Sequence, residues 1–176
     1  SSQVGSQQTT RALKISEDIL IVGIDFNSLS RYGRWPFPRW RHADLINAFS
    51  RLSDQGNRER ALFMDVFFVD PDRIPEDDAA LTGAIEQSGR VFLETVLTDA
   101  QSGIINETEL AERQAILYQS WGTLRDVRGD WKAMRPFLGY EPPLAAYAEA
   151  TKGYGHANFI PDQDGTFRRQ PLVLKS

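Results

Sequence analysis

The chain has no cysteine, few histidines and no long hydrophobic run. Without cysteine it can form neither disulfides nor thiolate metal sites. No stretch reaches the ~18 consecutive apolar residues that a membrane-spanning helix needs. The polar, uncharged residues 1–10 are also unlike a signal peptide, which begins with basic residues and continues with apolar ones. We therefore expect any membrane anchors of the natural protein to lie outside this sequence.

The common catalytic motifs are missing as well. The sequence contains no Gly-x-Ser-x-Gly elbow, and no Gly-x-Gly-x-x-Gly loop follows its first apolar run. His42 and His156 are the two histidines, and neither has a histidine four residues away. Both are predicted to be structural, with pH sensing as the open alternative because histidine titrates near neutrality. We expect no catalytic residue, no metal and no cofactor in this fragment.

What the chain does contain is typical of a globular domain. Its 176 residues are 41% hydrophobic and 25% charged, which predicts one domain with a real core. We expect residues 1–14 to be frayed and residues 99–140 to form an irregular or variable insertion. The net charge of −4 argues against nucleic-acid binding.

Charge is distributed unevenly along the sequence. Residues 31–60 hold seven arginines and three acids, whereas residues 70–112 hold eleven acids and two arginines. Such polarity could steer a charged ligand or a partner. It is equally compatible with two solvated faces.

Apolar runs alternate with helical patterns in the first half. Strands are predicted over 19–24, 61–68 and 91–97, and helices over 39–53 and from Asp77 or Asp78 to Ser88. The two near-continuous apolar runs favour parallel strands covered on both faces. This order therefore predicts a parallel βαβαβ arrangement.

The second half is less regular. Asn106 and Glu109 resemble a capping box for a helix reaching about residue 120, and a short helix is predicted over 144–151. Strands over 154–160 and 166–174 flank Asp164-Gly165, a strong hairpin signal. The fold class predicted is α/β, with a central mixed sheet, a parallel βαβαβ start, a C-terminal antiparallel hairpin and helices on both faces.

Two acids come at or near the ends of predicted strands. Asp25 follows the first apolar run and Asp65 lies within the second, with Asp70 shortly after. Carboxylates at neighbouring strand ends can hold a divalent cation for phosphoryl chemistry. Alternatively they cap turns or pair with arginines such as Arg34 and Arg39.

Between these acids lies a rigid aromatic loop, Trp35-Pro36-Phe37-Pro38, which is either a ligand platform or a plug at one end of the sheet. Loops at strand ends often carry ligand contacts. The candidate ligand-binding residues are Asp25, Arg34, Trp35, Arg39, Asp65, Asp70 and His156.

Several short segments together resemble one sensor family, and they occur in its order. They are Ile21-Val22-Gly23-Ile24-Asp25 with Ser28-Leu29, Gly33 to Arg39, Asp65-Val66-Phe67-Phe68 with Asp70-Pro71-Asp72, Asp77-Asp78 with Leu81, and Gly155-His156-Ala157-Asn158 followed by Asp162 to Gly165 and Arg168-Arg169. The chain is similar to the CHASE type-two domain, the second class of extracellular sensory domains associated with cyclases and histidine kinases. Residues 103–138 match nothing in that pattern.

This resemblance implies an extracytoplasmic, periplasmic sensor in an inner-membrane protein, tethered by membrane helices. It implies a cytoplasmic output module such as a nucleotide cyclase or a histidine kinase of a two-component system. It supplies no ligand and no catalytic residue. The expected partner is a small ligand or a periplasmic protein, and the domain could form a homodimer. The alternatives from the residues are a metal-dependent hydrolase using Asp25, Asp65 and Asp70, and a purely structural dimerisation module.

Overall fold

The fold was obtained as a computed structural model. It describes residues 16, 18–52, 56, 58–99, 106–108, 111–112, 114–115, 128–134 and 136–167. The chain divides into two compact units, residues 1–37 and 38–176. That the chain forms a single sensor domain stays a prediction.

The first unit contains the helix α1 (Phe26–Tyr32). Asp25 begins it, because its carboxylate accepts from the Ser28 backbone N–H at 2.9 Å while the Ser28 hydroxyl lies 3.3 Å from the Asp25 N–H. This reciprocal pair is a capping box, which satisfies amide groups that have no partner within the helix.

The strand predicted over 19–24 is wrong. These residues are irregular, and the large side chains among them are between 48% and 81% exposed. The composition of an apolar run does not show which segment it will pair with. A strand forms only where a neighbouring strand supplies hydrogen-bond partners. The parallel start is therefore shorter than predicted, with one strand–helix–strand unit.

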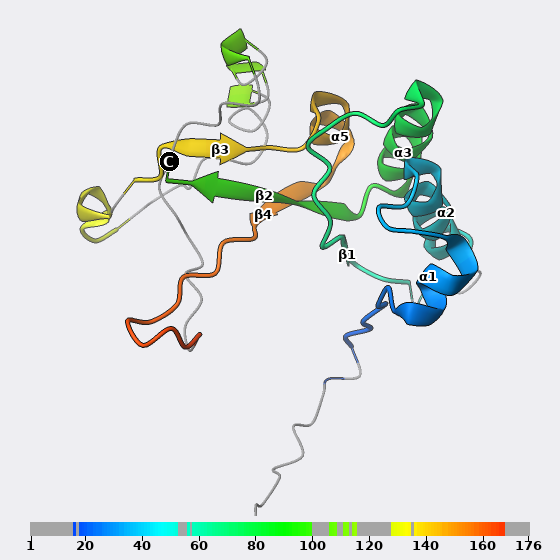
Figure 1. The fold of residues 1–176 in the computed structure, drawn as a ribbon, viewed down its shortest axis with the longest axis horizontal. Coiled ribbons are helices and arrows are strands. Elements are labelled where there is room, and N and C mark those ends of the chain that lie inside the picture. The colour runs from blue at the N-terminus through cyan, green and yellow to red at the C-terminus, as the bar shows by residue number, and fades with distance from the viewer. Residues whose placement is uncertain are drawn as a thin grey trace, which may run out of the picture. The chain divides into compact units, whose positions relative to one another are not determined.

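The second unit is built on a mixed sheet. β1 (Leu62–Phe63) and β4 (Gly153–His156) pair in parallel with β2 (Val91–Thr98), and β3 (Gly139–Glu141) pairs with it in antiparallel fashion. Helix α3 (Pro75–Ser88) connects β1 to β2. The predicted mixed α/β architecture is confirmed (Figure 1).

β2 is the central strand, and its hydrogen bonds assign each neighbour to an edge. The Phe92 carbonyl accepts from Met64 after β1 at 3.0 Å, whereas the Val91 carbonyl accepts from Lys152 before β4 at 2.8 Å. Successive carbonyls of a strand point to opposite edges. The β3 contacts again use an even-numbered carbonyl, so β3 lies along the same edge as β1, farther along β2.

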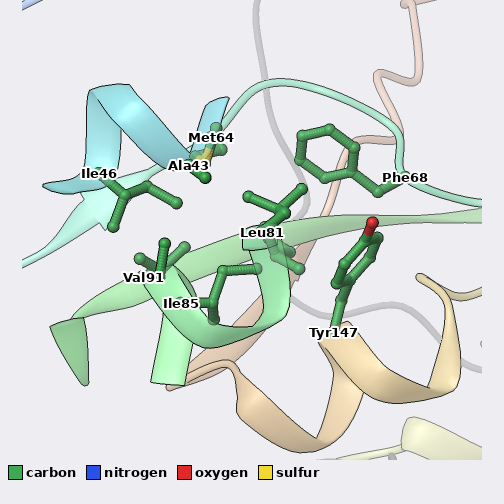
Figure 2. Close-up of a cluster of buried hydrophobic side chains, with 10 residues drawn as sticks. Ala43, Ile46, Met64, Phe68, Leu81, Ile85, Val91 and Tyr147 are labelled. Carbon is green, nitrogen blue, oxygen red and sulfur yellow. The ribbon is translucent and has the colours of Figure 1, made fainter. Parts of the chain in front are cut away.

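Three helices and the sheet enclose the core (Figure 2). α2 (Arg39–Ser50), α3 and α5 (Ala145–Ala150) each contribute to it. The cluster is Ala43, Ile46, Met64, Phe68, Leu81, Ala84, Ile85, Val91, Leu93 and Tyr147. The β2 residues among these are odd-numbered and share one face of the strand. Coverage of the other face by helices stays a prediction.

The start of α3 differs from the prediction. The helix begins at Pro75 rather than at Asp77 or Asp78, because proline supplies a helical φ and needs no hydrogen-bond partner at the first position. The acids then fall within the first turn, where the helix dipole favours them. Gly89 ends the helix with φ 61°, as predicted for a glycine stop.

The elements predicted for the second half of the chain are found in part. Residues 107–108, 111–112 and 114–115 are helical, in line with the helix predicted over 106–120, and the remainder of that helix lies outside the described residues. Within the expected irregular stretch, a short 3₁₀ helix, η2 (Trp131–Ala133), precedes β3. The predicted strand over 154–160 ends early, at His156.

The Asp-Gly turn is confirmed. The Gly165 N–H donates to the Asp162 carbonyl at 2.8 Å, and the Asp162 N–H donates to the Thr166 carbonyl at 3.0 Å. Gly165 adopts φ 77°, a conformation that glycine reaches without strain. From residue 168 onward the predicted second strand lies outside the described residues.

Beyond β4 a side chain continues the strand pairing. The Leu97 N–H donates to Asn158 Oδ1 at 2.9 Å, and Asn158 Nδ2 donates to the Leu97 carbonyl at 2.6 Å. The amide thus replaces both hydrogen bonds that a further strand residue would make. Asn158→Ala is expected to lower the free energy of unfolding by about 1–2 kcal/mol, since two partly buried backbone groups lose partners. Urea unfolding measures this.

Gln163→Ala provides the matched control for that change. Its amide side chain is exposed in the nearby turn, so its removal should alter stability by less than about 0.5 kcal/mol. Equal losses in the two variants would contradict the pairing role of Asn158.

Candidate functional site

Arg39 is the centre of the most connected polar cluster that the structure describes. Its guanidinium Nη2 donates to the Asp70 carbonyl at 2.9 Å, and its Nε lies 3.7 Å from Asp78 Oδ1. Its Cζ lies 4.8 Å from the ring centroid of Phe68, a cation–π contact. The Arg39 side chain is 12% exposed and that of Asp78 is 20% exposed, so their ion pair is largely shielded from water. We call Arg39, Asp72, Asp78, Phe68 and Tyr147 the Arg39 cluster.

Asp72 caps the helix that carries Arg39. The residue before α2 is Pro38, whose side chain makes no capping bond. Asp72 Oδ2 accepts instead from the Arg39 backbone N–H at 3.1 Å, across a separation of 33 residues. Partial burial alone would raise the pKa of Asp72, but backbone N–H groups, that of Arg39 foremost, hold it below its ordinary value. The carboxylate is therefore fixed in its charged form.

Asp78 joins three separate elements. Its Oδ2 accepts from the Asp72 backbone N–H at 2.9 Å, and its Oδ1 accepts from the Tyr147 hydroxyl of α5. Burial, and then Asp78 as acceptor and as charge, raise the pKa of Tyr147. The hydroxyl therefore keeps its proton and remains a donor. With Arg39 on the same carboxylate, Asp78 connects α2, the loop before α3 and α5.

Aromatic rings form the inner side of this cluster. Phe68 meets Tyr147 edge to face at a centroid separation of 5.7 Å, and it meets His42 in the same way at 5.2 Å. Figure 2 shows Phe68 and Tyr147 close to each other, beside Leu81. Burial, assisted by the charge of Arg39, lowers the pKa of His42 to about 4. His42 is thus neutral near pH 7, and it is unsuited to sensing pH near neutrality.

The predicted candidates Arg39 and Asp70 do meet, although not through the Asp70 carboxylate. Asp70 contributes its backbone carbonyl to Arg39, and the residue is exposed. Sequence reasoning missed Asp72, Asp78 and Tyr147 as site residues. The first two were visible as parts of an Asp-Pro-Asp and an Asp-Asp pair, but their contacts to Arg39 depend on the fold.

Asp25, Arg34 and Trp35 belong to the first unit. Asp25 is occupied as the cap of α1, and hydrogen bonds from Ser28 lower its pKa. Arg34 is exposed. Trp35 precedes a cis Pro36, remains 46% exposed and meets Phe37 edge to face at 5.5 Å. One part of its ring surface therefore packs within the unit and another is open to solvent.

Asp65 and His156 lie on the sheet. Asp65 is exposed and follows β1, and burial and then the neighbouring Asp65 raise the pKa of Glu94 on β2. His156 is half-buried at the end of β4, paired with Thr95. Glu94 was not selected from the sequence, although one acid in an otherwise apolar predicted strand is a recognisable signal.

The described residues set two limits on this site. They contain no group of three or more His, Cys, Asp or Glu side chains placed to hold a metal ion. No described helix is long and apolar enough to cross a membrane.

Comparison with family models gives a match along nearly the whole chain. The model of the CHASE2 domain matches residues 4–176. The chain belongs to the CHASE2 family. No curated protein and no solved structure matches it. CHASE2 is an extracellular sensory domain family, so the chain is a sensory domain with an extracytoplasmic location rather than an enzyme.

The segments that resemble the family can now be placed in the CHASE2 structure. Arg39 closes the Gly33 to Arg39 segment, Phe68 and Asp72 come from the next, and Asp78 from the one after. These three segments converge on the Arg39 cluster, in the second unit. Several residues of these family-like segments therefore join the helices to the loop after β1.

Proposed function

We propose that this CHASE2 domain is the extracytoplasmic signal-sensing part of a bacterial transmembrane receptor. Its output module would be a cytoplasmic nucleotide cyclase, histidine kinase or similar enzyme. The observation that carries this proposal is membership of a sensory family over residues 4–176. In the full-length protein the domain is tethered to the inner membrane, and it recognises a small ligand or a periplasmic protein, as a monomer or homodimer.

The Arg39 cluster supports a signalling role because it connects elements far apart in the sequence. Arg39, Asp78 and Tyr147 belong to three different helices and meet at one carboxylate. A signal can shift a receptor between two states only by binding one of them more strongly. A cluster that couples α2, α3 and α5 allows a contact at one helix to be felt at the others.

The alternative of a metal-dependent hydrolase receives no support from the side-chain arrangement. Asp25 uses its carboxylate to cap α1, and Asp70 offers Arg39 a backbone carbonyl. The structural dimerisation module is likewise favoured by no specific contact among the described residues. We retain the sensor as the proposed function.

The test requires a full-length receptor in membranes. Replacing the CHASE2 domain with a flexible linker is expected to change the output activity by at least about threefold, because the bias that the folded domain imposes is lost. Output would be measured as nucleotide or phosphoprotein formation, at matched protein levels. An output unaltered under all conditions would contradict the proposal.

A further inference from the structure

Glu94 is a carboxylic acid in the middle of the central strand. Its residue is 5% exposed, and its neighbours Leu93 and Thr95 are buried as well. The described part of the chain gives its Oε2 no hydrogen-bond partner. Carboxylates are almost never buried this fully unless they are paired or protonated. The position therefore requires an explanation that the Arg39 cluster does not supply.

The sheet register brings a second acid beside it. Phe63, the last residue of β1, pairs with Phe92 of β2, and continuing this register by two residues places Asp65 next to Glu94 on the same face. On the other edge of β2 the residue paired with Glu94 is Gly155, which has no side chain to offer. Asp65 and Glu94 together are called the carboxyl pair.

Other charged groups on this face do not neutralise the carboxyl pair. Arg90, at the start of the same row, is engaged by Glu59 at 2.9 Å. Farther along the row, Glu141 of β3 pairs with Val96 and adds another acid. The core residues of α2, α3 and α5 pack against the odd-numbered side chains of β2 and so cover the opposite face. Among the described residues, the charge nearest to Glu94 in this arrangement is thus the like charge of Asp65.

Two adjacent carboxyl groups without a cation share a proton, because repulsion and burial both oppose a second negative charge. Burial, followed by the hydrogen bond and the charge of Asp65, raises the pKa of Glu94 to about 8. A protonated Glu94 has an O–H group that it can donate to Asp65. In the ionised state the same two groups repel each other across the junction of β1 and β2.

We propose that the carboxyl pair is a proton-binding site that holds the segment after β1 against β2 and releases it when the proton leaves. The location favours release, because β1 has two residues and Met64, directly before Asp65, makes the adjoining main-chain bond to Phe92. The ligand is the proton itself, and the inference concerns the isolated domain. It stands whether or not the proposed receptor role is correct.

Urea unfolding of the domain between pH 6.5 and 8 tests the carboxyl pair. Because the folded state holds the proton more tightly than the unfolded state, stability falls as pH rises toward the folded pKa. The logarithm of the unfolding constant should rise by up to about one unit per pH unit in this range. Glu94→Gln, which cannot ionise, should remove most of this slope. A slope that persists in Glu94→Gln overturns the proposal.

Glu86→Gln is the matched control. Glu86 is exposed on α3, so this substitution removes the same charge as Glu94→Gln without altering the buried acid. The control variant should keep the slope of the parent domain. A loss of slope in both variants would assign the effect to net charge and overturn the proposal.

Two measurements on the unmodified domain keep the proposal testable even if Glu94→Gln fails to fold. Carbon-13 NMR of the carboxyl groups should show Glu94 titrating with a midpoint near pH 8, whereas a midpoint between 4 and 5 overturns the shared proton. Hydrogen exchange of the Met64 amide should lose protection as the pH passes 8, beyond the intrinsic base-catalysed increase. Unchanged protection overturns the release of this segment.

Discussion

Arg39→Ala is expected to lower the free energy of unfolding by about 2–3 kcal/mol. The substitution removes the hydrogen bond to the Asp70 carbonyl, the ion pair with Asp78 and the cation–π contact with Phe68. The main cost comes from Asp78, whose side chain is only 20% exposed and which would be left without its cationic partner. Loss of one partner of a shielded pair is more destabilising than replacement of both.

The matched control is Arg51→Ala. Arg51 is exposed at the carboxyl end of the same helix, so its loss should change stability by less than about 0.5 kcal/mol. Urea denaturation at pH 7 measures both. A loss below about 1 kcal/mol for Arg39→Ala would contradict the energetic role assigned to the cluster.

A double-mutant cycle separates the ion pair from the other contacts of Arg39. If the two side chains interact as described, Arg39→Ala should cost less in an Asp78→Asn background than in the parent protein. We expect a coupling free energy of about 1 kcal/mol, since the Nε–Oδ1 distance of 3.7 Å is long for a hydrogen bond. Strict additivity would place the cost of Arg39→Ala in packing and in the Asp70 hydrogen bond.

Local patterns predicted several elements of the fold correctly. The apolar run over 91–97 became β2, and the periodic residues Leu81 and Ile85 of α3 became core. The Asp-Gly turn formed because the left-handed conformation of Gly165 is a property of that residue. The turn depends on interactions that span few residues, whereas the pairing of β2 with β1, β3 and β4 depends on segments far from it in the sequence.

The wrong prediction concerns a segment whose structure depends on a pairing partner elsewhere in the chain. The run over 19–24 has the composition of a buried strand, but composition names no neighbour to pair with. For Asp25 the sequence left two roles open, a strand-end ligand and a turn cap, and the structure shows it capping α1 with Ser28. The spacing of Asp25 and Ser28 is a local signal for this cap.

The candidate site was predicted only in part, for the same reason. Arg39 was selected from its motif, but its partners come from 31 to 39 residues farther along the chain. Tyr147 lies 69 residues from Asp78, and no spacing rule links a tyrosine in an alanine-rich helix to that acid. The charge distribution along the sequence showed that the arginines and the acids were segregated, but not which ones would meet.

His42 and Glu94 give the domain two opposing responses to acid, and this leads to the second large expected effect. The pKa of His42 falls from an ordinary 6.5 to about 4 on folding, so the folded state binds fewer protons between these values and stability drops as the pH falls. The pKa of Glu94 rises from an ordinary 4.5 to about 8, which raises stability as the pH falls toward 4.5. Between pH 4.5 and 6.5 the two contributions oppose each other.

Removing one group should therefore expose the other. His42→Phe keeps an aromatic ring against Phe68 and cannot be protonated. This variant should gain about 2 kcal/mol of unfolding free energy between pH 6.5 and 4.5, relative to the change that the parent protein shows over the same interval. Glu94→Gln should lose a similar amount over that interval, again relative to the parent. Urea unfolding at closely spaced pH values measures both.

The opposing signs distinguish the two groups from each other. Glu86→Gln, which removes the same charge as Glu94→Gln from an exposed position, should keep the pH dependence of the parent protein. His42→Gln, which keeps a polar side chain, should reproduce the pH dependence of His42→Phe even if its stability at pH 7 differs. If the parent protein and His42→Phe respond identically to acid, His42 does not remain neutral through burial beside Arg39.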